Sequence, residues 1–244
     1  MTDPHAAEHI IKSYDTELSR LLDEIARMGL LAREQLADAS VAVAERDSEL
    51  AARVVERDNA IDALEHEVSH DVLRLLALRQ PIARDLREVL AALRIAADIE
   101  RIGDYAANVA KRGIALNQSA PVTPAAALPR LAEVAGRMLA DVLDAYRRHD
   151  AAAALEVWER DEQLDQLYTA LFRELLTYMM EDPRNITPCT HLLFMAKNIE
   201  RIGDHATNIA ENVYFLVHAR PLAEARRKGD LTSDVTPPVQ GHRR

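Results

Sequence analysis

The sequence contains Ile99-Glu100-Arg101-Ile102-Gly103-Asp104-Tyr105-Ala106-Ala107-Asn108-Val109-Ala110 and, 100 residues further on, Ile199-Glu200-Arg201-Ile202-Gly203-Asp204-His205-Ala206-Thr207-Asn208-Ile209-Ala210. Nine of the twelve positions are identical, and the polar residues repeat together with the apolar ones. A repeat of polar residues indicates a shared function, because packing alone needs only the hydrophobic period. The chain is therefore expected to hold two copies of one unit.

The repeat extends to earlier parts of the chain. Residues 56–62 align with residues 159–165 at an offset of 103, whereas the later motif repeats at an offset of 100. The second copy therefore lacks three residues between these segments, near Pro81 in one copy and Pro183 in the other. Because insertions and deletions belong in loops, both prolines are expected at turns.

Apolar residues recur at alternating spacings of three and four along most of the chain, which predicts amphipathic helices. Stripes this regular are typical of long helices packed in bundles. We expect an all-α fold with Asp47 and Asp150 as N-caps. Six long helices forming two tandem repeated three-helix bundles are predicted at residues 6–45, 48–79, 82–115, 125–148, 151–181 and 188–219.

The domain boundaries follow from the prolines and from the loss of the apolar stripe. The segment 117–124, with two prolines, separates the copies, so the first repeat is predicted at 1–118 and the second at 119–220. Residues 221–244 lack an apolar stripe and are predicted to be a disordered tail.

Composition excludes several classes of protein. Aromatic residues make up 4% of the 244 residues, which argues against a β-sandwich or barrel. The net charge of −10 disfavours nucleic acid and anionic lipid as general partners. A lone Cys189 excludes an internal disulfide framework, and no charge-free apolar span or leader pattern is present, so we expect a cytoplasmic protein.

Carboxylates and amides are spaced by four on the helices that carry the doubled motif. Side chains four apart lie on the same face of a helix, where like charges repel by about 0.2–0.5 kcal/mol. Facing helices would unite them with a second set of carboxylates on the preceding helix of each bundle. Oxygen donors with few His or Cys suit hard cations. The candidate metal ligands are Asp58, Asp62, Glu100, Asp104 and Asn108 in the first copy, and Asp161, Asp165, Glu200, Asp204 and Asn208 in the second.

The residues alone leave an alternative to metal open, which is a salt-bridge network with Arg57, Arg101, Arg160 and Arg201. His205 is a weaker candidate ligand because Tyr105 takes its place in the first copy. Gly103 and Gly203 lie in helix interiors, where glycine costs about 0.5–1 kcal/mol. We expect them to permit close helix packing rather than direct approach of a ligand.

Further stretches around the doubled motif resemble a known family. They are Leu78-Arg79-Gln80-Pro81 with Asp85-Leu86-Arg87, and Leu192-Leu193-Phe194-Met195-Ala196-Lys197 leading into the second copy. Together with the doubled Glu-Arg-Ile-Gly-Asp segment followed by Asn, they make the chain closely resemble the PhoU family of bacterial phosphate-responsive regulators. The resemblance covers about residues 8 to 218.

The resemblance implies two three-helix bundles, commonly in a homodimer, with metal clusters at the carboxylate pairs named above. The metal would be divalent or trivalent, with iron, Mg, Mn, Ca and Zn as candidates. Family members restrain the phosphate-starvation response when phosphate is ample. They link the high-affinity phosphate ABC transporter to a sensor histidine kinase, so membrane association is indirect. Lys111, where the second copy has Glu211, puts equal metal occupancy of the two bundles in doubt.

Two rival functions are weighed against this one. A carboxylate-bridged di-iron enzyme would need two Glu-x-x-His pairs, and the only candidate, Glu67 with His70, has no counterpart in the second copy. We identify no phosphate-binding loop, dinucleotide glycine pattern or His-Glu-x-x-His pattern, so we expect no catalytic activity. The second rival is a metal-free helical scaffold whose acidic stripe docks a basic partner.

Overall fold

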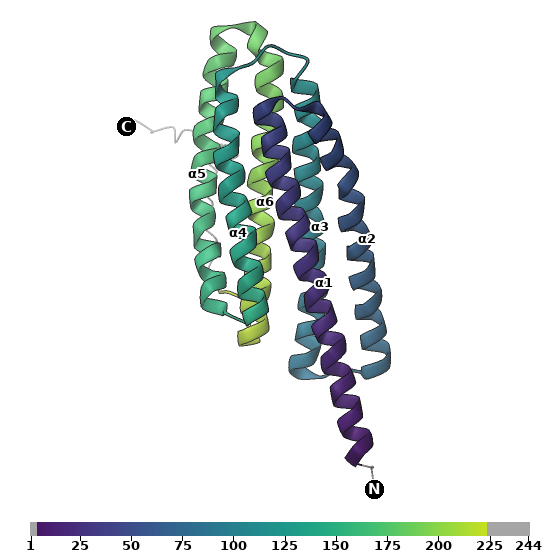
Figure 1. Ribbon diagram of the computed structural model, residues 1–244. Helices are drawn as coiled ribbons and strands as arrows, with labels where there is room; N and C mark the ends of the chain where they lie inside the picture. Colours follow the sequence, from purple (N-terminus) through teal and green to yellow (C-terminus); the bar gives the residue numbers. More distant parts are fainter. Residues whose placement is uncertain (1–3, 224–244) are drawn as a thin grey trace, which may run out of the picture.

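The computed structural model describes residues 4–223, with side chains described from Thr16 onward (Figure 1). Six α-helices and two short 3₁₀ helices make up this part of the chain, which contains no strand. Most of the predicted tail, residues 224–244, lies outside the described residues. The elements in chain order are α1 (Pro4–Glu45), α2 (Ser48–Arg79), α3 (Ala83–Leu116), η1 (Thr123–Ala127), α4 (Leu128–Arg148), α5 (Ala151–Glu181), η2 (Pro183–Asn185) and α6 (Ile186–His218).

The predicted helix starts at Asp47 and Asp150 are confirmed. Asp47 lies in an extended backbone conformation, and its Oδ1 accepts hydrogen bonds of 2.9 Å from the backbone N–H groups of Glu49 and Leu50. Asp150 does the same for Ala153 at 3.0 Å. Each carboxylate satisfies N–H groups that a first helical turn leaves without partners, which fixes where α2 and α5 begin.

The helices form two groups that lie against each other, and consecutive helices within each group run antiparallel (Figure 1). Helices α1, α2 and α3 make one bundle, and α4, α5 and α6 make the other (Figure 1). The most extensive contact in the chain joins α3 to α6, and one hydrophobic core runs through both bundles. The two copies of the doubled motif therefore lie on neighbouring central helices. A search of the described helices finds no segment with the length and apolar character of a membrane span.

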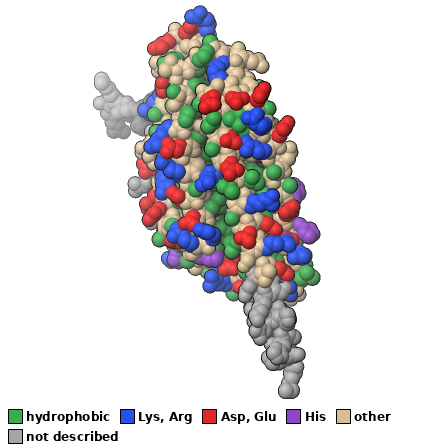
Figure 2. All heavy atoms as spheres, viewed as in Figure 1, with side chains coloured by type: hydrophobic (Ala, Val, Ile, Leu, Met, Phe, Trp, Pro, Cys, Tyr) green, Lys and Arg blue, Asp and Glu red, His purple; other side chains and the backbone are tan. Residues whose placement is uncertain are grey.

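The apolar stripe of the doubled motif is buried in the core, as the periodicity predicted. Ile99, Ile102 and Ala106 of α3 are fully buried, and so are Ile199 and Ile202 of α6. On the face drawn in Figure 2, acidic and basic side chains are interspersed over the outside of the bundles. The helix registers are fixed by this burial, since rotating either central helix would expose its apolar stripe.

The repeated glycines permit close approach of neighbouring helices. A Cβ at Gly103 would lie 2.8 Å from Ile61 Cδ1 and 3.3 Å from Asp58 Oδ1. A Cβ at Gly203 would collide with Leu164 and lie 3.1 Å from Asp161 Oδ1. Close helix packing at both glycines is therefore confirmed, and it brings Asp58 and Asp161 against the helices that carry these glycines.

Replacing Gly203 with Leu is expected to lower the free energy of unfolding by about 1–3 kcal/mol, because the added side chain must enter a filled space. The matched control is Gly136→Ala in α4, where the new Cβ meets only Leu36 Cδ2 at 3.9 Å. That change is expected to stabilise by about 0.5–1 kcal/mol through helix propensity. Urea denaturation measures both, and wild-type stability in Gly203→Leu would contradict the packing role.

Candidate functional site

The predicted carboxylate ligands form one acidic patch in each bundle. The first patch consists of Asp58 and Asp62 on α2 with Glu100 and Asp104 on α3, all half-buried. The second patch consists of Asp161 and Asp165 on α5 with Glu200 and Asp204 on α6. Asp161, Asp165 and Glu200 are only 2%, 1% and 2% exposed. The two patches thus share a plan but differ in depth, which changes their electrostatics.

Carboxylates from both helices of the first patch influence one another. Burial raises the pKa of Asp58, a hydrogen bond from Gln35 opposes the rise, and Asp104 and Asp62 add to it. Burial also raises the pKa of Glu100, with Asp104 adding and Arg101 opposing. The carboxylates of α2 and α3 therefore face each other closely enough to repel, as the spacing predicted.

Gln35 of α1 is a member of the first patch that the sequence analysis missed. Its side-chain amide donates hydrogen bonds to Asp58 Oδ1 (2.9 Å) and to the backbone carbonyl of Gly103 (3.0 Å). The residue is 2% exposed. The sequence feature that could have identified Gln35 is its position as a polar residue within the apolar stripe of its helix. At the repeat offset of 103, the second bundle has Met138, which is fully buried and offers no donor.

Glu200 of the second patch has a strongly raised pKa. Burial raises its pKa to about 7, with Asp204 and Asp165 adding to the rise and a hydrogen bond from Lys197 opposing it. Lys197 Nζ donates 2.8 Å to Glu200 Oε1, whereas the buried Oε2 atom has no hydrogen-bond partner. Lys197 was also missed as a site residue, and Ala97 occupies its place in the first copy.

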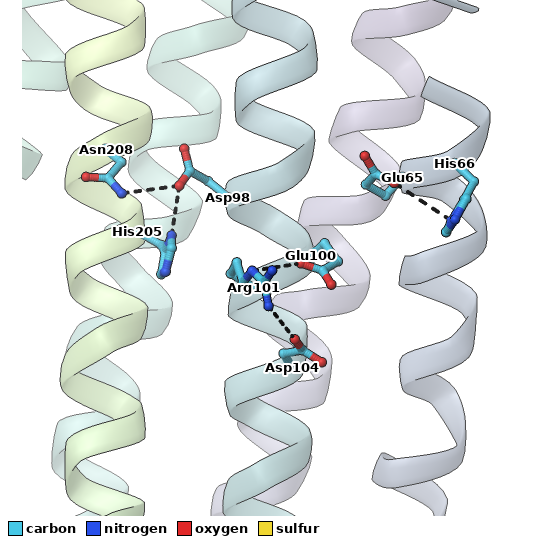
Figure 3. Close-up of polar contacts among 8 residues, drawn as sticks. All are labelled: Glu65, His66, Asp98, Glu100, Arg101, Asp104, His205 and Asn208. Atoms are coloured by element: carbon cyan, nitrogen blue, oxygen red, sulfur yellow. Dashed lines mark hydrogen bonds and ion pairs between the residues drawn. The ribbon is translucent and has the colours of Figure 1, made fainter. Parts of the chain in front are cut away.

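The predicted salt-bridge network forms only in part. Arg57 pairs with Asp38 of α1, and its repeat equivalent Arg160 pairs with Asp141 of α4. Both guanidinium groups thereby bind the first helix of their own bundle. Arg101 remains beside the first patch, 3.5 Å from Glu100 Oε2 and 3.3 Å from Asp104 Oδ2 (Figure 3). The guanidinium of Arg201 lies 5.7 Å from the ring of Tyr105.

His205 and Asn208 of α6 bind across the boundary between the bundles. His205 Nδ1 lies 2.8 Å from Asp98 Oδ1 of α3, and Asn208 Nδ2 donates to the same oxygen at 3.2 Å (Figure 3). A four-residue step turns a helix by about 400°, so two steps place Asn208 about 80° round from Glu200. This drift moves Asn208 toward α3, while Asn108 lies half-buried on α3.

The mismatch of Lys111 with Glu211 changes the charge beside each patch. Lys111 is close enough to lower the pKa of Asp58, although burial outweighs it. Glu211 accepts a 3.1 Å hydrogen bond from the indole N–H of Trp158. The first bundle therefore carries an amide donor and an added cation, whereas the second carries a methionine and an added carboxylate at the corresponding places.

The donor chemistry of the second patch fits a hard cation. Its ligands would be carboxylate oxygens, and Glu200 keeps a buried Oε2 atom without a hydrogen-bond partner. As the side chains stand, no group of three or more His, Cys, Asp or Glu residues in the described part of the chain is arranged to hold a metal ion. Metal ligation by these residues therefore stays a prediction.

Both repeats match a family model described as the PhoU domain, at residues 25–113 and again at 128–213. The chain is 60% identical over 227 residues to a phosphate-specific transport system accessory protein PhoU homolog of Xylella fastidiosa (strain 9a5c), covering 93% of this chain and 96% of that protein. It is 50% identical over 230 residues to a protein of the same name from Caulobacter vibrioides (strain NA1000 / CB15N), covering 93% of this chain and 99% of that protein.

Two solved structures share the fold. The crystal structure of PhoU from Pseudomonas aeruginosa is 38% identical and matches with a TM-score of 0.81, covering 85% of this chain and all of that chain. The phosphate transport system regulatory protein PhoU from Streptococcus pneumoniae is 33% identical, with a TM-score of 0.79 and coverages of 86% and 99%. The all-α fold with two tandem repeats is therefore confirmed.

Proposed function

Because the chain belongs to the PhoU family, we propose that it is an accessory protein of a phosphate-specific transport system and restrains the phosphate-starvation response. The observation that carries this proposal is the match of both repeats to the family model, with named relatives similar over nearly their whole length. The role is regulatory, and we assign no catalytic step to the protein.

The regulatory role is proposed to be that of an adaptor in the cytoplasm. The protein would contact cytoplasmic components of the phosphate ABC transporter and a sensor histidine kinase, and would act as a homodimer. Two long bundles joined through α3 and α6 support this role, because they present separate helical surfaces on one body. Charged side chains over those surfaces suit steered, reversible contacts with partners.

Metal binding is proposed as part of this function, with the buried Oε2 atom of Glu200 as the supporting observation. Asp161, Asp165, Glu200 and Asp204 would hold the ion. When bound, the ion would supply a local positive charge that attracts phosphate or the carboxylates of a partner. Lys197 would then turn from Glu200 Oε1, since a metal takes over the charge that it compensates. The metal-free scaffold remains the alternative, separated by the metal measurement described below.

Deletion of the gene is expected to raise a phosphate-starvation reporter in high-phosphate medium, because the restraint on kinase signalling is lost. Plasmid-borne wild-type protein should restore repression, and Gly136→Ala, whose added Cβ meets only Leu36 Cδ2 at 3.9 Å, should restore it equally. A reporter that stays repressed in the deletion strain would overturn the proposed function.

A further inference from the structure

Helix α2 carries a metal-binding pattern that the carboxylate patches do not use. His66-Glu67-Val68-Ser69-His70 matches His-Glu-x-x-His, in which two histidines four apart on one helix face bind a metal ion. The expectation that the chain lacks this pattern is therefore wrong, because Glu67 was considered only together with His70. The equivalent residues of the second copy, 169–173, are Thr, Ala, Leu, Phe and Arg, so the pattern belongs to the first bundle alone.

Both imidazoles face solvent at the rim of one hollow. The side chains of His66 and His70 are 83% and 78% exposed. The hollow has a volume of about 370 Å³ and is lined by Arg20, Glu24, His66, Glu67, His70 and Asp71. Arg20 pairs with both Glu24 and Asp71, which leaves three carboxylates against one guanidinium. The hollow is therefore net negative and attracts cations.

The ring nitrogens are oriented as metal-binding histidines usually are. His66 Nδ1 lies 2.7 Å from the backbone carbonyl of Asp62. Since a carbonyl oxygen only accepts, Nδ1 is the protonated nitrogen, and Nε2 carries the lone pair. His70 Nδ1 lies 3.6 Å from Asp71 Oδ1, so a carboxylate stands on the same side of the second ring. A hydrogen bond such as that of His66 fixes the tautomer of a metal-binding imidazole.

We propose that His66 and His70 bind one late first-row divalent ion, Cu²⁺, Ni²⁺ or Zn²⁺, through their Nε2 atoms, with water completing the coordination. Imidazole prefers these ions, whereas the carboxylate patches suit hard cations. Peptidases with this motif add a third protein ligand. Among the side chains that the structure describes, no group of three or more His, Cys, Asp or Glu could hold a metal ion. The site therefore binds metal without catalysing hydrolysis. It is independent of the proposed regulatory function.

Protons compete with the metal at His66. The hydrogen bond with the Asp62 carbonyl, together with the nearby Glu65, raises the pKa of His66. Metal needs the neutral ring, so the affinity measurement belongs at pH 8. Figure 3 shows His66 beside Glu65 on α2, separate from Glu100 and Asp104 on α3. Variants at the histidines and at the carboxylates of α3 are therefore distinguishable.

The test is a calorimetric titration of the untagged, chelator-treated full chain with Cu²⁺ at pH 8, paired with electron paramagnetic resonance. We expect one site with two coordinating nitrogens. Loss of a residue that only hydrogen-bonds to a metal ligand costs roughly tenfold or more in metal affinity. Loss of a ligand itself should cost at least as much, so His66→Ala and His70→Ala should each weaken binding by at least about tenfold. The exposed control His218→Ala should leave this site unchanged.

The double variant Asp104→Ala, Asp204→Ala should also keep the histidine site, which separates it from the acidic patches. Circular dichroism melting checks that His66→Ala and His70→Ala remain folded, as their exposure predicts. An unchanged affinity and nitrogen count in His70→Ala would overturn the proposal, and so would wild-type protein that binds no Cu²⁺. Repression of the starvation reporter by His70→Ala would leave the regulatory function standing in either case.

Discussion

Glu200→Gln is expected to stabilise the metal-free protein by roughly 3 kcal/mol at pH 8, because it removes a buried charge. Burial raises the folded-state pKa of Glu200 to about 7 from an ordinary value of 4.5. Between these pH values the folded chain holds a proton that the unfolded chain has released. The free energy of unfolding of the wild type therefore falls as pH rises from 4.5 to 7 and levels off above that.

The measurement is urea denaturation of chelator-treated protein at pH 6 and pH 8. Between pH 6 and pH 8 the free energy of unfolding of the wild type is expected to fall by about 1 kcal/mol or more because of Glu200. This contribution should be absent from Glu200→Gln. Glu181→Gln, at the exposed end of α5, is the matched control and should follow the wild-type profile. If Glu200→Gln keeps the wild-type difference between pH 6 and pH 8, the buried charge is not the cause.

The helices were predictable from sequence because their signals are local. The stripe through Ile99 and Ile102 fixes the buried face of α3. The carboxylates of Asp47 and Asp150 fix the first turns of α2 and α5 through hydrogen bonds two or three residues along the chain. Periodicity and capping of this kind need no knowledge of the rest of the fold.

The surroundings of the patches were not predictable in the same way, because they depend on helices distant in sequence. Gln35 reaches Asp58 and Gly103 only after α1 packs against α2 and α3. Asn208 shares the four-residue spacing of Glu200 and Asp204, yet the accumulated turn of the helix carries it to Asp98. Spacing alone therefore groups residues on a face but does not say which neighbour that face meets.

Unequal metal content of the two bundles is the second large effect that we expect. In the first patch, Gln35 donates to Asp58 Oδ1, and Arg101 lies beside Glu100 and Asp104. These groups already compensate the negative charge, so a cation gains less by binding there. Lys111 adds further positive charge near Asp58.

The side chains around the second patch differ from those around the first. Met138 replaces the amide of Gln35, Glu211 replaces Lys111, and Arg201, the equivalent of Arg101, lies 5.7 Å from the ring centre of Tyr105. Lys197 remains beside Glu200, yet burial still holds the pKa of that carboxyl near 7. A cation that ionises Glu200 would remove this penalty, so we expect metal binding to be more favourable in the second bundle.

The variant Asp161→Asn, Asp165→Asn is therefore expected to lose most of the metal found by elemental analysis of freshly purified protein. The matched variant Asp58→Asn, Asp62→Asn should lose a smaller share, since both pairs occupy the same repeat positions. Both variants and the wild type should also carry His70→Ala, so that metal bound at the histidine site does not contribute to the measured content. Equal losses would contradict the asymmetry, and metal-free wild-type protein would favour the scaffold. Because the fold supplies both patches with the same four carboxylates, any difference must come from the side chains that surround them.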